Sequence, residues 1–247
     1  MGSVGNKSES YYDFKDNPTL STNNVSGHDA SEWWQEHTEM SNLNEWADNL
    51  ITPNELGAVE SWVGASYDDL ADLYTTEWDD LDSDTRKVAT DLFNALNKFE
   101  LKKGITVNRN TNFMILGAER RSQKMTEAQV KNYLENYTDN GLIQSDGFMS
   151  FSTRTNGVAV AGSGLVIHLN VPPNKGGGAY ISTVGGNPSE REYLVNNNSI
   201  MKFDSRSVRT DEKGNVHVNA KLVGRAQMQT VDSKNNSKFR KEPKPKF

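Results

Sequence analysis

The sequence predicts an α+β protein in which an N-terminal helical lobe packs on a β-sandwich core. Two observations predict this class. Apolar residues recur at helical spacing in the first hundred residues, and short strand-like runs separated by Gly, Pro and Asn follow from about residue 104. The chain has 247 residues, of which 34% are hydrophobic and 9% aromatic, and this is enough to form a globular core.

Four helices are expected, three before residue 100 and one after it. Their first turns lie near Asp29–Ser31, Pro53–Asn54, Ser83 and Thr126, where capping residues or a proline precede the apolar pattern. The second helix carries Leu56, Val59, Trp62 and Val63, and the third carries Val88, Leu92, Leu96 and Phe99. These spacings place each set on one helix face, which we interpret as core-facing.

The strands are predicted from short apolar runs with turn residues between them. Alternation of apolar and polar residues is clearest in Val166–Val171 and in Val216–Asn219. The expected strands are Ile105–Arg109, Gly147–Ser152, Leu165–Val171, Gly178–Thr183, Glu192–Val195, Ile200–Ser205 and Val216–Val223. Many short strands after a helical block favour the sandwich.

Composition divides the chain into three parts. Residues 1–28 are rich in Ser, Asn, Asp and Gly, and we expect a disordered or linker segment. Residues 29–228 form the folded domain, with a helical lobe at 29–100 and a mostly β core at 101–228. Residues 229–247 form a flexible basic tail.

Charge is distributed unevenly. Residues 1–100 hold 5 basic and 21 acidic side chains, whereas residues 101–247 hold 22 basic and 12 acidic ones. The two lobes therefore either meet different partners or attract each other, and the sequence leaves both open. We do not expect nucleic-acid binding. No membrane segment is predicted, because the best apolar run, 158–171, is interrupted by Gly, Ser, His and Asn. No signal peptide is predicted, because the first 24 residues hold no apolar block.

Cysteine is absent, which excludes disulfides, a cysteine nucleophile and a thiolate metal site. The four histidines show no metal-binding spacing, and His168 and His217 are interpreted as structural residues of strands. Candidate chemistry therefore rests on hydroxyl, carboxylate and guanidinium groups.

Three strand motifs carry such groups in order along the chain. They are a strand that ends in Arg109, the run Gly147–Thr153 and the run Ser189–Leu194. Residues at i and i+2 of a strand face the same side, so Ser150 and Ser152 share a face, and Glu190 and Glu192 share one. An arginine binds phosphate through its fixed fork of donors, and a carboxylate stabilises a developing cation. The set suits cleavage of a glycosidic bond next to a pyrophosphate.

The order and spacing of these motifs resemble the ADP-ribosyltransferase exoenzyme family, in the arginine–serine–glutamate branch of mono-ADP-ribosyltransferases of bacterial toxins and phages. The resemblance covers about residues 55–225. Its motifs are Leu56–Leu70 for the first helix pair, Gly104–Arg109 for the arginine strand, Gly147–Ser152 for the Ser-Thr-Ser motif, Val171–Ile181 before the target loop and Glu190–Leu194 for the Glu-x-Glu motif.

The resemblance implies that NAD is the co-substrate and that no metal is needed. Arg109 would hold the NAD phosphates or the adjoining ribose. Ser150 would orient Glu192, and Ser152 would support the bound ribose. Glu192 would bond the ribose 2′-hydroxyl and stabilise the oxocarbenium ion, while Glu190 would position and deprotonate the acceptor. In the family, a glutamate at the position of Glu190 marks arginine as the acceptor.

Further contacts are implied around this set. Asn110 is expected to contact the cofactor. The segment 153–164 would cover the phosphates and nicotinamide, with Arg154 as a second phosphate contact. Residues 180–189 would form the loop that presents the target, with Tyr180 stacking on the acceptor. An ordinary hairpin connection is the alternative interpretation of that loop.

Three positions depart from the family pattern. Asn108 stands where the family usually has an aromatic residue, Phe151 replaces the usual Thr, and the 153–164 segment has no aromatic to stack on nicotinamide. We therefore expect slower NAD turnover.

The predicted function is transfer of ADP-ribose from NAD to an arginine of a target protein. Two alternatives are an NAD glycohydrolase, with water as the acceptor, and a catalytically weak partner-binding module. Actin and host transcription or translation proteins are the targets that the resemblance suggests. We expect no receptor-binding or translocation domain within 247 residues. The protein would therefore act in the host cytoplasm after secretion, injection or delivery by a carrier or a virion, or after synthesis inside the target cell.

Overall fold

The computed structural model describes the folded part of the chain in several stretches: 11–13, 36–40, 43–64, 81–145, 147–153, 164–182, 184 and 191–226. The first expected helix start, at Asp29–Ser31, and the basic tail at 229–247 lie outside the described residues. In the part that is described, no helix is long and apolar enough to cross a membrane.

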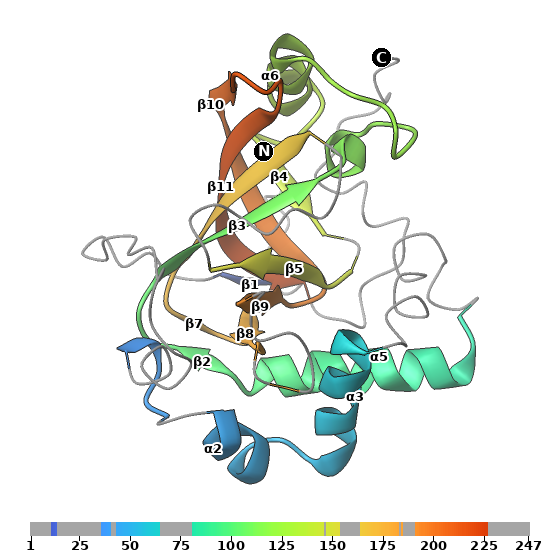
Figure 1. The fold of residues 1–247 in the computed structure, drawn as a ribbon, viewed down its shortest axis with the longest axis vertical. Helices are drawn as coiled ribbons and strands as arrows, with labels where there is room; N and C mark the ends of the chain where they lie inside the picture. The colour runs from blue at the N-terminus through green and yellow to red at the C-terminus, as the bar shows by residue number, and fades with distance from the viewer. Residues whose placement is uncertain are drawn as a thin grey trace, which may run out of the picture.

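A single mixed sheet forms the core of the molecule (Figure 1). Its strands follow the order β4, β10, β11, β6, β3, β5, β9 and β8, and β1 pairs with β11 beside this path. Their bounds are β1 Tyr11–Asp13, β3 Ile105–Thr111, β4 Leu142–Gln144, β5 Met149–Ser152, β6 Leu165–Val171, β8 Gly178–Tyr180, β9 Glu192–Val195, β10 Ser199–Thr210 and β11 Val216–Ala226. β2 (Glu100–Leu101) and β7 (Asn174–Lys175) form a separate two-stranded sheet.

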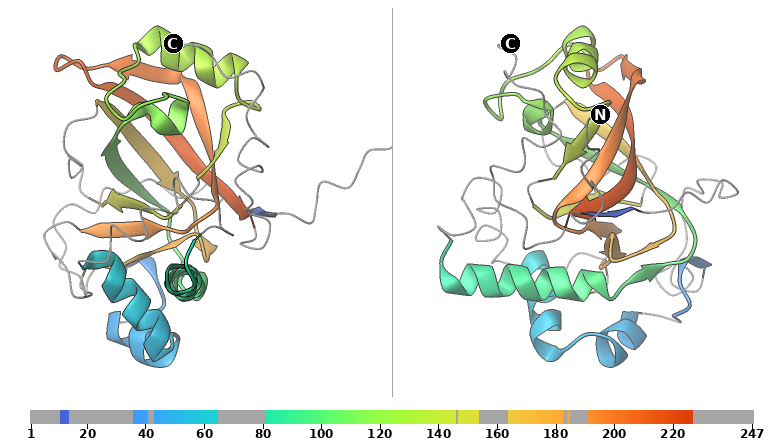
Figure 2. Two further views of the ribbon diagram at one scale, coloured as in Figure 1. Left: turned by 90° about the vertical axis from the view of Figure 1, so that its right-hand side faces the viewer. Right: turned by 180° about the vertical axis from the view of Figure 1, so that it is seen from behind.

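The helices lie at two ends of this sheet. α2 (Leu43–Asn49), α3 (Pro53–Val63) and α5 (Ser83–Asn97) form the helical lobe at one end. The short helix η3 (Phe113–Leu116) and α6 (Glu127–Asn136) lie at the other, as Figure 2 shows from two further sides. The expected α+β architecture with an N-terminal helical lobe is confirmed.

The sheet has a narrow joint between β3 and β5. These strands are registered through one pair, Asn108 with Ser152, whereas β3 and β6 are registered through seven pairs. The joint connects the β4-to-β3 part of the sheet to the smaller part made of β5, β9 and β8. The position of β5 and β9 relative to β3 therefore depends strongly on packing.

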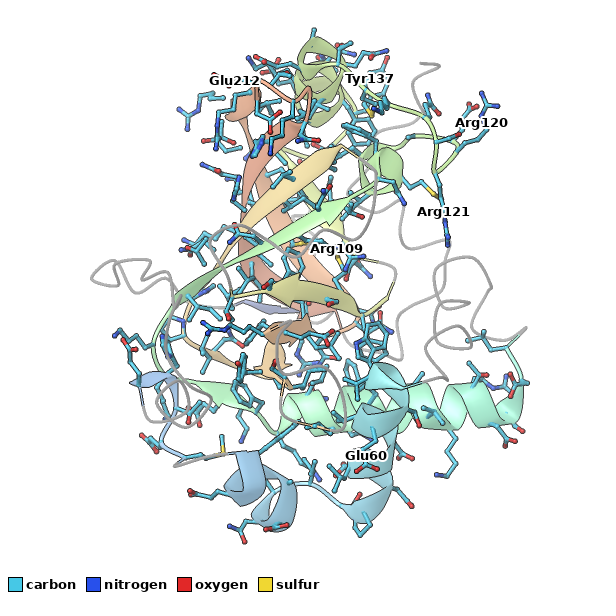
Figure 3. The ribbon with its side chains drawn as sticks, in the orientation of Figure 1. Glu60, Arg109, Arg120, Arg121, Tyr137 and Glu212 are labelled. Carbon is cyan, nitrogen blue, oxygen red and sulfur yellow. The ribbon has the colours of Figure 1, made fainter. Side chains whose placement is uncertain are left out.

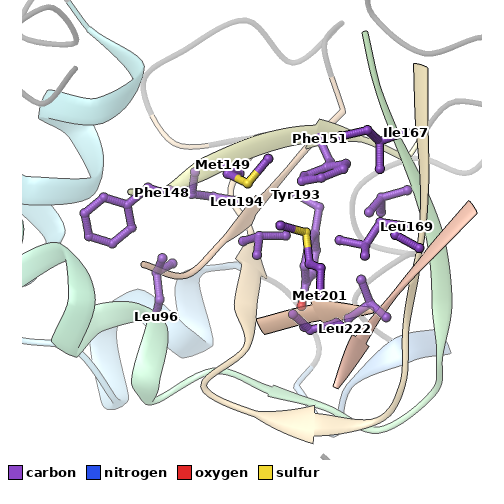
Figure 4. Close-up of a cluster of buried hydrophobic side chains, with 14 of the residues drawn as sticks. Leu96, Phe148, Met149, Phe151, Ile167, Leu169, Tyr193, Leu194, Met201 and Leu222 are labelled. Atoms are coloured by element: carbon purple, nitrogen blue, oxygen red, sulfur yellow. The ribbon is translucent and has the colours of Figure 1, made fainter. Parts of the chain in front are cut away.

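That packing is supplied by apolar side chains on one face of the strands. Phe151 of β5, Tyr193 of β9 and Leu169 of β6 are at most 2% exposed, and they meet residues of β10 and β11 in one cluster (Figure 4). Leu96 brings α5 to the same region, next to Phe148. A fully buried side chain of this size stabilises the fold by about 1.5–3 kcal/mol.

The opposite face of the same strands is polar. Along β6 the buried residues alternate strictly with half-buried ones, and His168 and Asn170 are among the latter. The equivalent positions are Asn108 on β3, Ser150 and Ser152 on β5 and Glu192 on β9, because Cα partners in a sheet face the same side. The sheet thus separates a core from a row of polar groups.

Most predicted strands are found, with small shifts at their ends. Leu165–Val171 and Glu192–Val195 have the predicted bounds. α5 begins at Ser83, but its N-cap is Asp82 and not Ser83, because the Asp82 carboxylate accepts the backbone N–H groups of Asp84 and Thr85 at 2.9 Å each. Tyr11–Asp13 form a strand within the segment expected to be disordered, and this strand pairs with the edge of β11 at Gly224–Ala226.

α3 is fixed to α5 by a charged group at its first turn. Thr52 caps α3, and Glu55 closes a capping box by accepting the Thr52 N–H at 2.6 Å. The same carboxylate accepts from Lys98, at 2.7 Å, just beyond α5. Burial opposes ionisation of Glu55, but the bonds from Lys98 and Thr52 outweigh burial and lower its pKa. This ionised group therefore fixes the start of α3.

We predict that Glu55→Gln destabilises the protein by about 1 kcal/mol at pH 7. Glutamine keeps the capping box and loses only the charge, and Lys98 is 37% exposed, so solvent screens the pair. Because the folded pKa lies below the ordinary value, the contribution is complete above about pH 5 and is lost as pH falls through the folded pKa. Urea unfolding of both proteins from pH 3 to 8 measures it. A difference that is constant with pH would contradict this prediction.

Candidate active site

Three buried polar residues lie side by side across the joint of the sheet. Asn108 on β3 is the Cα partner of Ser152 on β5, and Ser152 is the partner of Glu192 on β9. Their exposed fractions are 3%, 4% and 7%. Two of the predicted site residues, Ser152 and Glu192, are therefore direct neighbours on one face of the sheet. A buried carboxylate needs hydrogen-bond donors around it.

One of those donors comes from the helical lobe. The indole Nε1–H of Trp62, at the end of α3, donates to Oε1 of Glu192 at 3.0 Å, and both side chains are buried. The Trp62 ring also makes an edge contact with Phe148, with centroids 5.7 Å apart. Trp62 thus packs as a core residue on one side and orients the carboxylate on the other. A hydrogen bond to a charged group contributes about 1.5–3 kcal/mol.

The backbone around Glu192 is held from both sides. The Ile181 N–H donates to the carbonyl oxygen of Glu192 at 3.0 Å, next to β8. The N–H and Oγ1–H of Thr153 both donate to the carbonyl oxygen of Arg191, at 3.0 and 3.3 Å. Arg191 has a positive φ of 50°, an uncommon conformation for a non-glycine residue. These hydrogen bonds therefore fix the backbone conformation at the start of β9.

Arg109 ties β3 to β5 from the position next to Asn108. Its Nη1–H donates to the carbonyl oxygen of Ser150 at 2.6 Å, so the guanidinium bridges the joint, beside β5 in Figure 3. Within the described residues, neither the buried Nε of Arg109 nor the buried Oδ1 of Asn110 has a hydrogen-bond partner.

The remaining predicted residues lie less centrally or outside the described part. Ser150 is half-buried on the same face as Ser152, with Leu194 as its Cα partner. Tyr180 is 4% exposed on β8 and belongs to the core, so in this arrangement its ring offers no surface to a target protein. Glu190 and Arg154 lie outside the described residues.

Sequence reasoning did not include Trp62 in the site. Its helical spacing predicted a core position, and that is correct, but the partner of its N–H is 130 residues away. The one available signal was the amphipathic character of tryptophan, whose N–H needs an acceptor when it is buried. Asn108 was noted only as a departure from a family pattern, although it lies beside Ser152.

No group of three or more His, Asp or Glu side chains that could hold a metal ion occurs in the described stretches. The site consists of carboxylate, hydroxyl, amide, indole and guanidinium groups. A buried carboxylate with fixed orientation can stabilise a cation that develops next to it.

Solved structures of similar fold are bacterial ADP-ribosylating proteins. Plx2a, an ADP-ribosyltransferase toxin from Paenibacillus larvae, aligns with a TM-score of 0.62 and 20% identity over 78% of this chain and 94% of its own. C3stau2 from S. aureus with NAD has a TM-score of 0.58 and 18% identity over 82% and 97%. BECa of C. perfringens with NADH has a TM-score of 0.63 and 23% identity, over 78% of this chain and 47% of its own. These similarities concern the fold.

Among curated protein sequences, none matches the chain. The family model described as ADP-ribosyltransferase exoenzyme matches residues 32–225, which include the helical lobe, all three motifs and most of β11. Since this match spans most of the sequence, the chain belongs to the ADP-ribosyltransferase exoenzyme family.

Proposed function

We propose that the protein is a mono-ADP-ribosyltransferase that cleaves NAD at the nicotinamide glycosidic bond and transfers ADP-ribose to an arginine of a target protein. Membership of the family supports NAD as the co-substrate and the transfer itself. The observation that carries the proposal is the buried Glu192, which lies beside Ser152 and accepts the indole N–H of Trp62. The arginine acceptor is inferred from Glu190, which lies two residues before Glu192 in the sequence.

Glu192 is the residue that we assign to the first half of the reaction. As the bond between C1′ and the nicotinamide nitrogen breaks, its electron pair neutralises the pyridinium, and positive charge develops on the ribose. A carboxylate held in place before the reaction stabilises that charge without reorganising. The hydrogen bond from the Trp62 indole to Oε1 also orients the Glu192 carboxylate toward the ribose 2′-hydroxyl.

Glu190 is assigned to the second half. A guanidinium nitrogen forms the new bond to C1′, and the proton that it loses passes to the Glu190 carboxylate. Two carboxylate oxygens can accept two N–H groups of one guanidinium, which orients the nucleophile. Water in place of the guanidinium gives the glycohydrolase reaction, so the two activities differ only in the acceptor.

The other predicted residues are assigned to cofactor contacts. Arg109 reaches the NAD phosphates or the adjoining ribose with the donors that Ser150 does not occupy, and Asn110 offers its buried Oδ1. Ser150 and Ser152 support the nicotinamide ribose from the polar face of β5. Arg154 is a second phosphate contact.

The chemistry of the acceptor defines the proposed target, which is a protein that presents an arginine. Actin and host transcription or translation proteins are examples. Its modification would occur in the host cytoplasm after delivery by secretion, injection or a virion, or after synthesis of the protein in that cell. Loop 180–189 would present the target to Glu190. Because Tyr180 is buried, other residues of this loop would contact the target.

The proposal predicts different effects for the two glutamates. With agmatine, a small guanidino compound, as the acceptor, Glu192→Gln lowers nicotinamide release at least 100-fold, because it removes the charge opposite the developing cation. Glu190→Gln abolishes ADP-ribosyl-agmatine but keeps nicotinamide release, with water as the acceptor. Liquid chromatography of both products measures this.

Glu60→Gln is the matched control, because Glu60 is an exposed carboxylate on α3 (Figure 3), and it should leave both products unchanged. Thermal melts check that the variants fold. If the wild type releases nicotinamide but forms no ADP-ribosyl-agmatine, the acceptor is water and not arginine. No release at all would contradict the proposed activity.

The contact between Trp62 and Glu192 generates a further prediction. Trp62→Phe keeps an aromatic ring against Phe148 but removes the N–H donor, and we expect kcat of nicotinamide release to fall about tenfold with little change in KM for NAD. Phe148→Leu removes the ring contact and keeps the donor. Equal loss of kcat in the two variants would show that Trp62 acts through packing alone.

A further inference from the structure

An uncommon backbone conformation lies directly between the two glutamates of the Glu-x-Glu motif. Arg191 has a φ of 50°, in the left-handed region, where Cβ crowds the backbone of most residues. The other non-glycine residues of positive φ in the described stretches are Asn140 and Asn198, both in turns. Asparagine is several-fold enriched in this region, and arginine is not. The conformation of Arg191 must therefore be held by its surroundings.

One residue supplies two hydrogen bonds that hold it. The N–H of Thr153 donates to the carbonyl oxygen of Arg191 at 3.0 Å, and the Oγ1–H of Thr153 donates to the same oxygen at 3.3 Å. Thr153 is 1% exposed, so water does not readily replace these donors. It directly follows Ser152, the last residue of β5 and the Cα partner of Glu192. The end of β5 thus fixes the residue that precedes β9.

The position of Glu192 itself does not depend on the φ angle of Arg191. The carbonyl oxygen of Glu192 accepts the N–H of Ile181 at 3.0 Å, next to β8. Its strand partner on β5 and the indole N–H on its carboxylate hold it from other sides. A change in the φ angle of Arg191 therefore leaves Glu192 in place and redirects the chain that precedes it.

That preceding chain carries Glu190. β9 begins at Glu192, so the alternation of a strand does not extend back to Glu190. The expected shared face of the two glutamates depends instead on the residue between them. The φ angle is the rotation about the N–Cα bond of Arg191, and it sets the direction of the peptide group that links Arg191 to Glu190.

We propose that the left-handed conformation of Arg191, held by Thr153, directs Glu190 toward the acceptor and determines whether ADP-ribose passes to a guanidinium or to water. Thr153 is thus a positioning residue, and Arg191 acts through its backbone. The proposal rests on the proposed function for the roles of the two glutamates. In both reactions the bond from C1′ to the nicotinamide nitrogen breaks. The new bond to C1′ comes from a guanidinium nitrogen, whose proton passes to Glu190, or from a water oxygen, whose proton passes to solvent.

Two substitutions at position 191 separate the backbone from the side chain. Arg191→Asn and Arg191→Val both remove the guanidinium, but asparagine suits the left-handed region and a β-branched residue does not. With agmatine as the acceptor, the transfer fraction is the amount of ADP-ribosyl-agmatine divided by the nicotinamide released. We expect Arg191→Val to lower this fraction about tenfold, with total release within about twofold of the wild type. Arg191→Asn, the matched control, keeps the wild-type fraction.

Substitutions of Thr153 test the donor. Thr153→Val has nearly the same shape but lacks the hydroxyl, so the Arg191 carbonyl keeps only the backbone N–H. One hydrogen bond of this kind shifts an equilibrium by about fivefold, which is the largest loss of transfer fraction that we expect. Thr153→Ser keeps the hydroxyl and restores the fraction. Total nicotinamide release shows in each variant that Glu192 is still in place.

NMR reports the conformation independently of catalysis, because a positive φ gives a strong intraresidue NOE between the amide proton and Hα. We expect this NOE at residue 191 in the wild type and in Arg191→Asn, and a weaker one in Arg191→Val and Thr153→Val. A wild type that forms no ADP-ribosyl-agmatine contradicts the proposed acceptor, and the NOE still decides whether Thr153 holds Arg191. Equal transfer fractions in Arg191→Asn and Arg191→Val, or a weak NOE in the wild type, overturn this inference.

Discussion

The structure depends on the single registered pair that joins β3 to β5. Through Asn108 and Ser152, the sheet brings the polar face of β3 next to that of β5 and β9, and so next to Glu192. One pair is a weak connection by itself, and it is supported by Arg109, whose guanidinium bonds the Ser150 carbonyl, and by the apolar cluster behind the strands. Stability and active-site geometry are thus properties of the same joint.

The helical lobe contributes to the site through one side chain. α3 is fixed to α5 at its first turn by Glu55 and Lys98, and at its last turn it delivers the indole of Trp62 to Glu192. Because α3 is a rigid helix, the ion pair at its first turn helps to fix the position of the indole that bonds the proposed catalytic carboxylate. The helical lobe thus supplies a hydrogen-bond donor to a site whose other groups lie on strands.

The sequence allowed the fold class and most strands to be predicted, because alternation in a half-buried strand such as Leu165–Val171 is a local signal. Ser152 and Glu192 were predicted as site residues because each belongs to a short motif, and the structure places them side by side. Trp62 and Asn108 were not assigned roles, because their partners are 130 residues away or on another strand. The cap of α5 was misplaced by one residue, since Asp and Ser in succession both suit an N-cap.

The central claim is that the polar face of β3, β5 and β9 holds the nicotinamide ribose of NAD. The most direct measurement is a crystal structure with a non-hydrolysable carba-NAD. We predict the nicotinamide ribose within hydrogen-bond distance of Glu192, with the Trp62 indole still on that carboxylate and the phosphates toward Arg109. A dinucleotide bound elsewhere, or one that displaces Glu192 from the row with Ser152, would contradict the account.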